Sequence, residues 1–329
     1  MIKATKADIE KYSTTVGSEE IGGSLDKLFV RLNSKFLSGF LKEASKSECY
    51  YVTHVDDLID DFCKGKDASY FPLSKVSVML KQERYKYIPD KIETLNNEVL
   101  GSRVCNAVGV PTVYNDTIKI DKDYYTMSID FVRPSQKIIR LIGNGRVNDT
   151  SHFSEWEKLF DEQLPYVLPS QSNKEKMIKQ LKSTFVEPFL VHNLILDDAD
   201  FYPRNACIIE NTKKNTFSWA PQNDFELILG GRNKNDFDMD AEVYLNYLFY
   251  HYPVELKKFM KKVMIKMCKN EQLNEAKVEL FFDDEMKKND WCVEQIQQLK
   301  DNFNRLINTY KKVVDREKSR IEHVNSLHR

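Results

Sequence analysis

The 329-residue sequence lacks the cysteine and histidine spacings that define a disulfide framework or a zinc-type centre. Its six cysteines are scattered, with no CxxC pair and no cluster of cysteine with histidine. The six histidines are equally dispersed. This spacing is typical of isolated free thiols in a reducing compartment, and metal-site spacing is absent.

The sequence also lacks a charge of one sign and a long apolar run. Its 49 basic and 50 acidic residues leave a net charge of −1, which gives no general attraction to nucleic acid or anionic lipid. No apolar run approaches the roughly 20 residues of a membrane helix. The first 25 residues have no apolar centre of the kind found in signal peptides. We therefore expect a cytoplasmic protein, with secretion as a leaderless effector as an open alternative.

Repeats and low-complexity tracts are absent, and what remains is the composition of a folded protein. Apolar residues make up 41% and aromatic residues 12% of the chain, which is enough for a sizeable core. The length is long for one domain and suits two lobes.

The first part of the chain, up to residue 69, is predicted to be a mostly helical extension. Leu28, Leu32, Phe36 and Phe40 lie near helical spacing within residues 25–44. A second short helix is expected over residues 55–67. Its acidic residues have two interpretations, a metal site or a solvated helix face, and the solvated face is favoured because nothing convergent lies nearby. These acidic residues are Asp56, Asp57, Asp60 and Asp61.

The pattern changes at Tyr70 and predicts a strand over residues 75–88. Residues alternate there, so that Val78 and Leu80 face one way while Met79 and Lys81 face the other. A kinase nucleotide site uses this arrangement, with an apolar side chain against adenine and a lysine two residues later on the phosphates. The alternative is that Lys81 is an ordinary strand-end lysine facing water.

A helix is predicted over residues 89–111, with a capping-box pattern at Asp90 and Glu93 and Gly109 just past its end. Glu98 lies beside its apolar inner stripe. A carboxylate in that position is costly unless it is paired, and Lys81 is the natural partner. The alternative is that Glu98 reaches solvent.

Residues 110–132 alternate like a hairpin, with candidate turns at Asn115–Asp116 and Asp121–Lys122. A small antiparallel sheet with one helix is the make-up of a kinase amino-terminal lobe, which we place at residues 70–131. The segment 127–131 would then be the hinge whose main-chain groups bind adenine.

The rest of the chain, residues 132–329, is predicted to be a mainly helical lobe. Helices are expected near 154–164, from 172 to about 196 with a kink or break at Pro188, over 241–269 with a break at Pro253, and over 290–324. Residues 225–240 are expected to be irregular. The basic run at 257–269 has two interpretations, a nucleic-acid surface or an amphipathic core helix, and the core helix is favoured.

Two carboxylates and an amide in this second part have the order of a phosphoryl-transfer site. Asp200, four intervening residues and Asn205 lie between two apolar runs, and Asp224 follows a predicted hairpin at 207–221 with its turn near 212–215. Protein kinases place a carboxylate at the substrate hydroxyl, then an amide and a second carboxylate on magnesium.

These segments together resemble the HipA family of bacterial serine/threonine kinases, including its compact CtkA-like members. The likeness covers about residues 70–240 and lies in VMLKQ (78–82), NNEVLGSRVCNAVGVP (96–111), SIDF (128–131), DADFYPRN (198–205) and WAPQND (219–224). The last segment is similar to the family's A-P-x-x-D metal motif, and Glu226 stands where other kinases have the DFG glycine.

The resemblance implies an α+β, bilobal protein-kinase-like fold and an ATP- and Mg²⁺-dependent kinase that also phosphorylates itself. Its implied partners are a protein substrate and an antitoxin-type protein, with direct nucleic-acid binding not expected. The implied site is a set of nine residues. Asp200 and Lys81 would be catalytic, Lys81, Glu98, Met79, Ser128, Ile129 and Asp130 would bind ATP, and Asn205 and Asp224 would bind the metal.

The chain departs from the family pattern in two places. Phe201 and Tyr202 follow the catalytic aspartate, where the family usually has arginine and histidine, and no glycine-rich phosphate loop precedes the lysine strand. Three alternatives therefore stay open: a nucleotide-binding pseudokinase acting as a regulatory scaffold, a small-molecule kinase, and a helical interaction protein.

Overall fold

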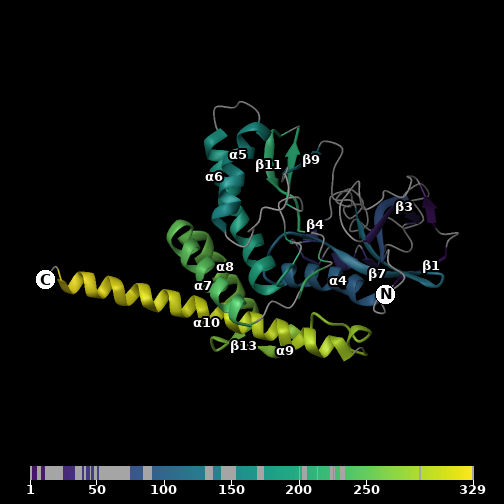
Figure 1. The fold of residues 1–329 in the computed structure, drawn as a ribbon. Coiled ribbons are helices and arrows are strands. Elements are labelled where there is room, and N and C mark those ends of the chain that lie inside the picture. The colour runs from purple at the N-terminus through teal and green to yellow at the C-terminus, as the bar shows by residue number, and fades with distance from the viewer. Residues whose placement is uncertain are drawn as a thin grey trace. The chain divides into compact units, whose positions relative to one another are not determined.

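The structure is a computed structural model, and it divides into two compact units (Figure 1). The first unit comprises residues 1–138, 209–216 and 220–227, and the second comprises residues 139–208, 217–219 and 228–329. The structure describes residues 2–5, 9–11, 25–33, 39–40, 42–44, 46–47, 50–51, 75–83, 91–129, 136–141, 153–168, 174–199, 201, 206–212, 214–222, 225, 227–229, 234–288 and 290–327.

A six-stranded sheet forms the body of the first unit, with strand order β1-β7-β8-β5-β3-β2. The pairs are antiparallel except β1 with β7, which is parallel. The strands are β1 (Ile2–Ala4), β2 (Ile9–Lys11), β3 (Leu25–Asn33), β5 (Lys75–Glu83), β7 (Asn115–Ile120) and β8 (Asp123–Ile129). A separate parallel pair joins β4 (Tyr50–Tyr51) to β6 (Thr112–Val113).

The helix predicted over residues 25–44 is wrong for residues 25–33, which form strand β3. Strand β3 pairs with β5 along its whole length, from Leu25 opposite Glu83 to Asn33 opposite Lys75. The error has a simple physical origin, because Leu28 and Leu32 are four residues apart, and that spacing keeps two side chains on one face of a strand as well as of a helix. The strands in residues 2–51 also correct the prediction of a mostly helical segment before residue 70.

Other predictions for this part of the chain are left open. Residues 39–40 and 42–44 are helical, as expected. The helix expected over 55–67, with its four aspartates, lies outside the described residues. The boundaries placed after residues 69 and 131 stay predictions.

Helix α4 (Lys91–Ala107) confirms the helix predicted before Gly109. Gly109 has a positive φ of 78°, which only glycine adopts without cost. The amide of Gly109 donates to Asn106 O at 3.1 Å and the amide of Val110 donates to Cys105 O at 2.9 Å. These two bonds form a Schellman motif, which satisfies carbonyls at the end of the helix.

Strands β7 and β8 confirm the predicted hairpin with its turn at Asp121–Lys122, where Asp121 has a φ of 53°. The second candidate turn, at Asn115–Asp116, is wrong, because both residues belong to β7 and Asn115 pairs with Ser128. The side chain of Asn115 is bonded to helix α4 instead of closing a turn.

A three-stranded sheet has the order β11-β10-β9, from β9 (Gln136–Arg140), β10 (Cys207–Asn211) and β11 (Thr216–Trp219). Strands β10 and β11 confirm the hairpin predicted over 207–221. Its turn lies where expected, with Asn215 at a φ of 50°.

Helices make up most of the second unit. They are α5 (Phe153–Val167), α6 (Lys174–Leu190), α7 (Lys234–His251), α8 (Pro253–Met267), α9 (Glu275–Glu279), the 3₁₀ helix η5 (Met286–Lys288) and α10 (Asp290–Leu327), with a short hairpin of β12 (Cys268–Lys269) and β13 (Gln272–Leu273). The helices predicted near 154–164, over 241–269 with a break at Pro253, and over 290–324 are confirmed. The expectation of irregular structure as far as residue 240 is wrong for residues 234–240, which begin α7. In Figure 1, α10 lies along α7, which is consistent with their extensive contacts.

The chain changes its helical winding shortly after Pro188. Helix α6 includes this proline and is followed directly by a π-helix, η3 (Val191–Ile195). The amide of Leu196 donates to Val191 O at 2.8 Å, five residues back. Helix α6 therefore continues through Pro188 without the break expected there, and the π-turn, a feature often found beside functional sites, begins at Val191.

Helix α8 confirms the amphipathic interpretation of the basic run 257–269. Its buried side chains are Leu256, Phe259, Met260, Val263 and Met267, while its lysines line the other side. Among the helices of the part of the chain that the structure describes, none combines the length and the apolar character needed to cross a membrane.

We expect Gly109→Ala to lower the free energy of unfolding by about 1–2 kcal/mol, because a Cβ is strained at positive φ. Urea denaturation of the full chain measures this change. Gly109→Asn is the matched control and should cost less, since asparagine tolerates the left-handed region. Equal losses for alanine and asparagine would contradict this explanation of the helix end.

Candidate active site

Lys81 lies near the centre of the six-stranded sheet, on strand β5 between β3 and β8. It is directly opposite Thr126 of β8 and Lys27 of β3. Lys81 is only 4% exposed, so the alternative of a lysine facing water is wrong. Its amine lies on the side of the sheet that helix α4 covers.

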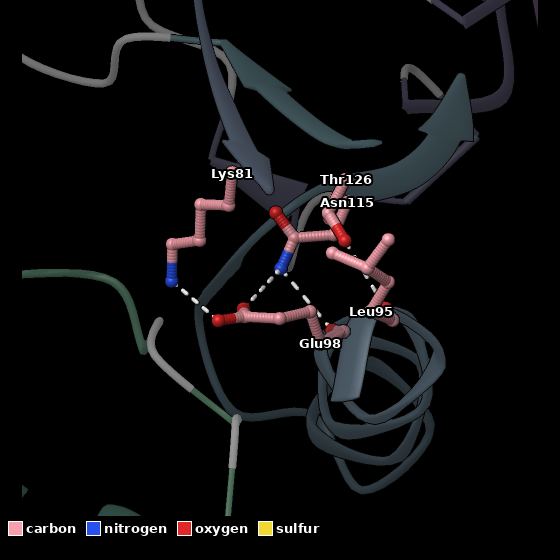
Figure 2. Close-up of polar contacts among 5 residues, drawn as sticks. All are labelled: Lys81, Leu95, Glu98, Asn115 and Thr126. Atoms are coloured by element: carbon pink, nitrogen blue, oxygen red, sulfur yellow. Dashed lines mark hydrogen bonds and ion pairs between the residues drawn. The ribbon is translucent and has the colours of Figure 1, made fainter. Parts of the chain in front are cut away.

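Glu98 on α4 forms a buried ion pair with Lys81, as the sequence predicts (Figure 2). The two side chains are 5% and 1% exposed. The alternative in which Glu98 reaches solvent is therefore wrong. Taking two charges out of water costs several kcal/mol for each ion, and only close pairing with further hydrogen bonds offsets that cost.

Asn115 supplies such further hydrogen bonds to the glutamate. Its Nδ2 donates to Glu98 O at 3.1 Å and to Glu98 Oε2 at 3.3 Å (Figure 2). One amide group therefore holds both the backbone and the carboxylate of Glu98. The lysine and the amide bond different carboxylate oxygens, which fixes the orientation of the glutamate.

Two hydroxyl groups fasten helix α4 to the strands around this pair. Thr126 Oγ1 on β8 donates to Leu95 O at 3.1 Å, and Ser102 Oγ on α4 donates to Val113 O at 2.6 Å. Because Thr126 is opposite Lys81, its bond ties the helix to the sheet beside the ion pair.

Three of the residues predicted to bind adenine lie close together in the sheet. Met79 on β5 is half-buried and directly opposite Ser128 on β8, and Val78 is opposite Ile129. Ser128 is also paired with Asn115 of β7, so its main-chain groups lie inside the sheet. Ile129 is the last residue of β8. Asp130 lies outside the described residues, and the adenine-binding role of this group stays a prediction.

The segment that precedes Asp224 is fixed to the first unit by backbone hydrogen bonds. The amide of Gln222 donates to Pro111 O at 2.9 Å, and Gln222 O accepts from the amide of Val113 at 3.0 Å and from Thr112 Oγ1 at 2.9 Å. Gln222 is therefore bonded to the residues that follow the glutamate helix, although it lies more than 100 residues later in the chain.

The segment that leads to Asp200 belongs to the second unit. His192, within the π-helix, has its Nδ1 2.7 Å from Asp198 Oδ2, and the amide of Asp198 donates to His192 O at 2.9 Å. Both side chains are buried. From α10, Asn302 Nδ2 donates to Ile195 O at 3.0 Å, which holds the end of the π-helix.

Phe201 packs on this same segment, at a position where the family that the sequence resembles usually has arginine. Its ring stacks on His192 with centroids 4.1 Å apart and an interplanar angle of 8°. It also lies 5.1 Å from the ring of Trp156 and 5.9 Å from that of Phe185. Phe201 is thus part of an aromatic core, where the family's arginine would need a buried counter-charge.

Three of the residues given catalytic or metal roles, Asp200, Asn205 and Asp224, lie outside the described residues, so their roles stay predictions. Within the described ranges, no three His, Cys, Asp or Glu side chains are grouped so as to hold a metal ion.

Several residues that shape the site were not found by sequence reasoning. The sequence around Asn115 is typical of a turn, and neither His192 nor Thr126 follows a recognisable motif. Gly101 is the residue whose role the sequence could have indicated. Glycine inside a helix is unfavourable, so its presence there suggests that another residue packs closely against it.

No protein-family model matches the chain, and no curated protein matches it in sequence. Among solved structures, the chain is similar to the Helicobacter pylori proinflammatory kinase CtkA, with a TM-score of 0.58 and 11% identity over 95% of this chain and 98% of that chain. It also matches HipA from the HipA, HipB and operator DNA complex of the Shewanella oneidensis MR-1 toxin–antitoxin system, with a TM-score of 0.45 and 13% identity over 74% of this chain and 61% of that chain. The likeness to CtkA confirms the predicted fold class, an α+β kinase-like fold with a sheet-based first unit and a mainly helical second unit.

We expect Glu98→Ala to lower the free energy of unfolding by about 3–5 kcal/mol, because it removes the carboxylate that pairs with the buried Lys81 charge. Chemical denaturation measures this loss. Replacing both partners, by Lys81→Met with Glu98→Leu, should cost less than the single change, since no charge remains to be solvated. A double variant less stable than Glu98→Ala would contradict the assignment of a buried ion pair.

We expect Phe201→Ala to lower the free energy of unfolding by about 3–5 kcal/mol through loss of aromatic packing. Phe201→Arg, which introduces the residue usual in the family, should be at least as destabilising because the guanidinium would be buried. Tyr166→Ala is the control, since Tyr166 is 90% exposed. An arginine variant as stable as the wild type would show that the aromatic core does not depend on Phe201.

Proposed function

We propose that the chain is an ATP- and Mg²⁺-dependent protein kinase that transfers the γ-phosphoryl group to serine or threonine hydroxyls, its own included. The observation that carries the proposal is the buried Lys81–Glu98 pair, formed between a central strand and the helix packed on it. Kinases use this pair to hold the lysine on the ATP phosphates. The fold's likeness to that of the kinase CtkA supports the same conclusion.

In the proposed site, Lys81 binds the phosphates and Glu98 holds its amine in place. Asn115 contributes by fixing the glutamate carboxylate, so that a single orientation of the lysine is favoured. The adenine ring would lie against Met79 and bind main-chain groups at residues 129 and 130, where β8 ends. The burial of Lys81 strengthens its attraction to phosphate, because charges interact more strongly away from water.

Asn205 and Asp224 would hold the magnesium ion, since amide and carboxylate oxygens are the ligands that this hard cation prefers. When bound, the ion neutralises charge on the β- and γ-phosphates. Asp200 would orient the substrate hydroxyl and accept its proton. The new oxygen–phosphorus bond forms as the bond from the γ-phosphorus to the bridging oxygen breaks.

The His192–Asp198 pair and Phe201 lie on either side of Asp200 in the chain. They hold the chain on both sides of this residue through a buried polar contact and an aromatic stack. We propose that they take over the positioning role of the arginine and histidine usual in the family, and that the departure from the pattern is compatible with catalysis. An antitoxin-type partner stays a prediction of the sequence resemblance.

We expect wild-type protein with radiolabelled ATP and Mg²⁺ to label itself or a general protein substrate. Asp200→Ala should reduce labelling by about 10²–10⁴-fold, the usual contribution of a general base, while ATP binding persists. Asp224→Ala should remove the Mg²⁺ dependence of ATP binding. Asp284→Ala, at an exposed site, is the control and should behave as wild type.

The outcomes of this assay separate the candidate functions. ATP binding without labelling would identify a nucleotide-binding pseudokinase, and labelling of small molecules alone would identify a small-molecule kinase. Absence of any ATP binding would identify an interaction protein and overturn the proposal.

A further inference from the structure

Helix α4 carries a glycine in its interior, one turn after Glu98. Gly101 is buried within the helix Lys91–Ala107. Glycine in the middle of a helix is unfavourable relative to alanine, because it loses more conformational freedom on folding. Its presence there is explained by what packs against it.

Phe225 occupies the space that a side chain at position 101 would need. A Cβ built on Gly101 would overlap Cγ, Cδ1 and Cβ of Phe225. These atoms belong to the stem and ring of a fully buried side chain, so they have no room to swing away. Gly101 therefore forms a socket for Phe225, and any larger residue at 101 would displace it.

Phe225 directly follows Asp224, and a second anchor lies two residues before Asp224. Gln222 is held by the backbone of residues 111–113 and by Thr112 Oγ1. The chain segment from 222 to 225 is therefore fixed at both ends within the first unit. One of its anchors is the helix that carries Glu98.

We propose that Gly101 and Phe225 are positioning residues, which set the location of Asp224 by fixing the following residue against helix α4. The proposal rests on the proposed function, in which Asp224 binds magnesium. It predicts that the lysine–glutamate pair and the metal-binding carboxylate depend on one helix, so that a disturbance of the socket impairs metal-dependent nucleotide binding.

The test compares Gly101→Ala, Phe225→Leu and the double variant with wild type. Phe225→Leu empties part of the socket without crowding it, and so tests the same contact if Gly101→Ala folds poorly. Gly39→Ala is the matched control, because a Cβ at Gly39 meets no heavy atom within 4 Å. The readouts are ATP affinity with and without Mg²⁺, and urea unfolding.

Each single variant should weaken ATP binding in Mg²⁺ on the order of tenfold or more, as expected when a ligand group is displaced by about 1 Å. ATP binding without Mg²⁺, which depends on Lys81, should change little. The double variant should lose less than the product of the two single losses, because both changes disturb one contact. Gly39→Ala should match wild type in both conditions.

If both single variants retain the wild-type Mg²⁺ effect on ATP affinity, the positioning role is wrong while the proposed function stands. Additive losses in the double variant would also overturn it. If wild type itself shows no Mg²⁺-dependent ATP binding, the proposed function and the positioning role both fall. The unfolding data would then still show whether the Gly101–Phe225 contact stabilises the fold.

Discussion

The burial of two opposite charges is the constraint on which the first unit depends. Lys81 and Glu98 cannot be buried separately, so helix α4 must lie where its glutamate meets the lysine of strand β5. The bonds from Asn115 to Glu98 and from Thr126 to Leu95 maintain that placement. The ion pair and its amide add a directional requirement that hydrophobic burial, which is non-directional, does not impose.

Much of the fold could be predicted because its signals are local. Gly109, Asp121 and Asn215 have positive φ angles, which turns and helix ends require, and Pro253 occupies the first turn of α8. The helix predicted for residues 25–33 was wrong because the spacing of their leucines suits a strand as well as a helix. Pairing with β5, which is distant in sequence, decides between the two.

The candidate site was predictable where the sequence places a charged residue on an apolar face, because such a residue requires a partner of opposite charge. Glu98 on an apolar helix face required a cation, and this requirement pointed to Lys81. The sequence gives no such indication for the supporting residues. Asn115, His192 and Phe201 occur in polar or aromatic segments in which residues of these types are common. Their roles come from tertiary neighbours, as the stack of Phe201 on His192 shows.

The packing of Phe225 against Gly101 also affects the order in which the chain can fold during synthesis. Domains generally fold as units from the amino terminus as they leave the ribosome. Here the core of the first unit lacks the buried ring of Phe225 until that residue has been made, after helices α5 and α6 have been synthesised. The first unit therefore completes its core only after part of the second has been synthesised.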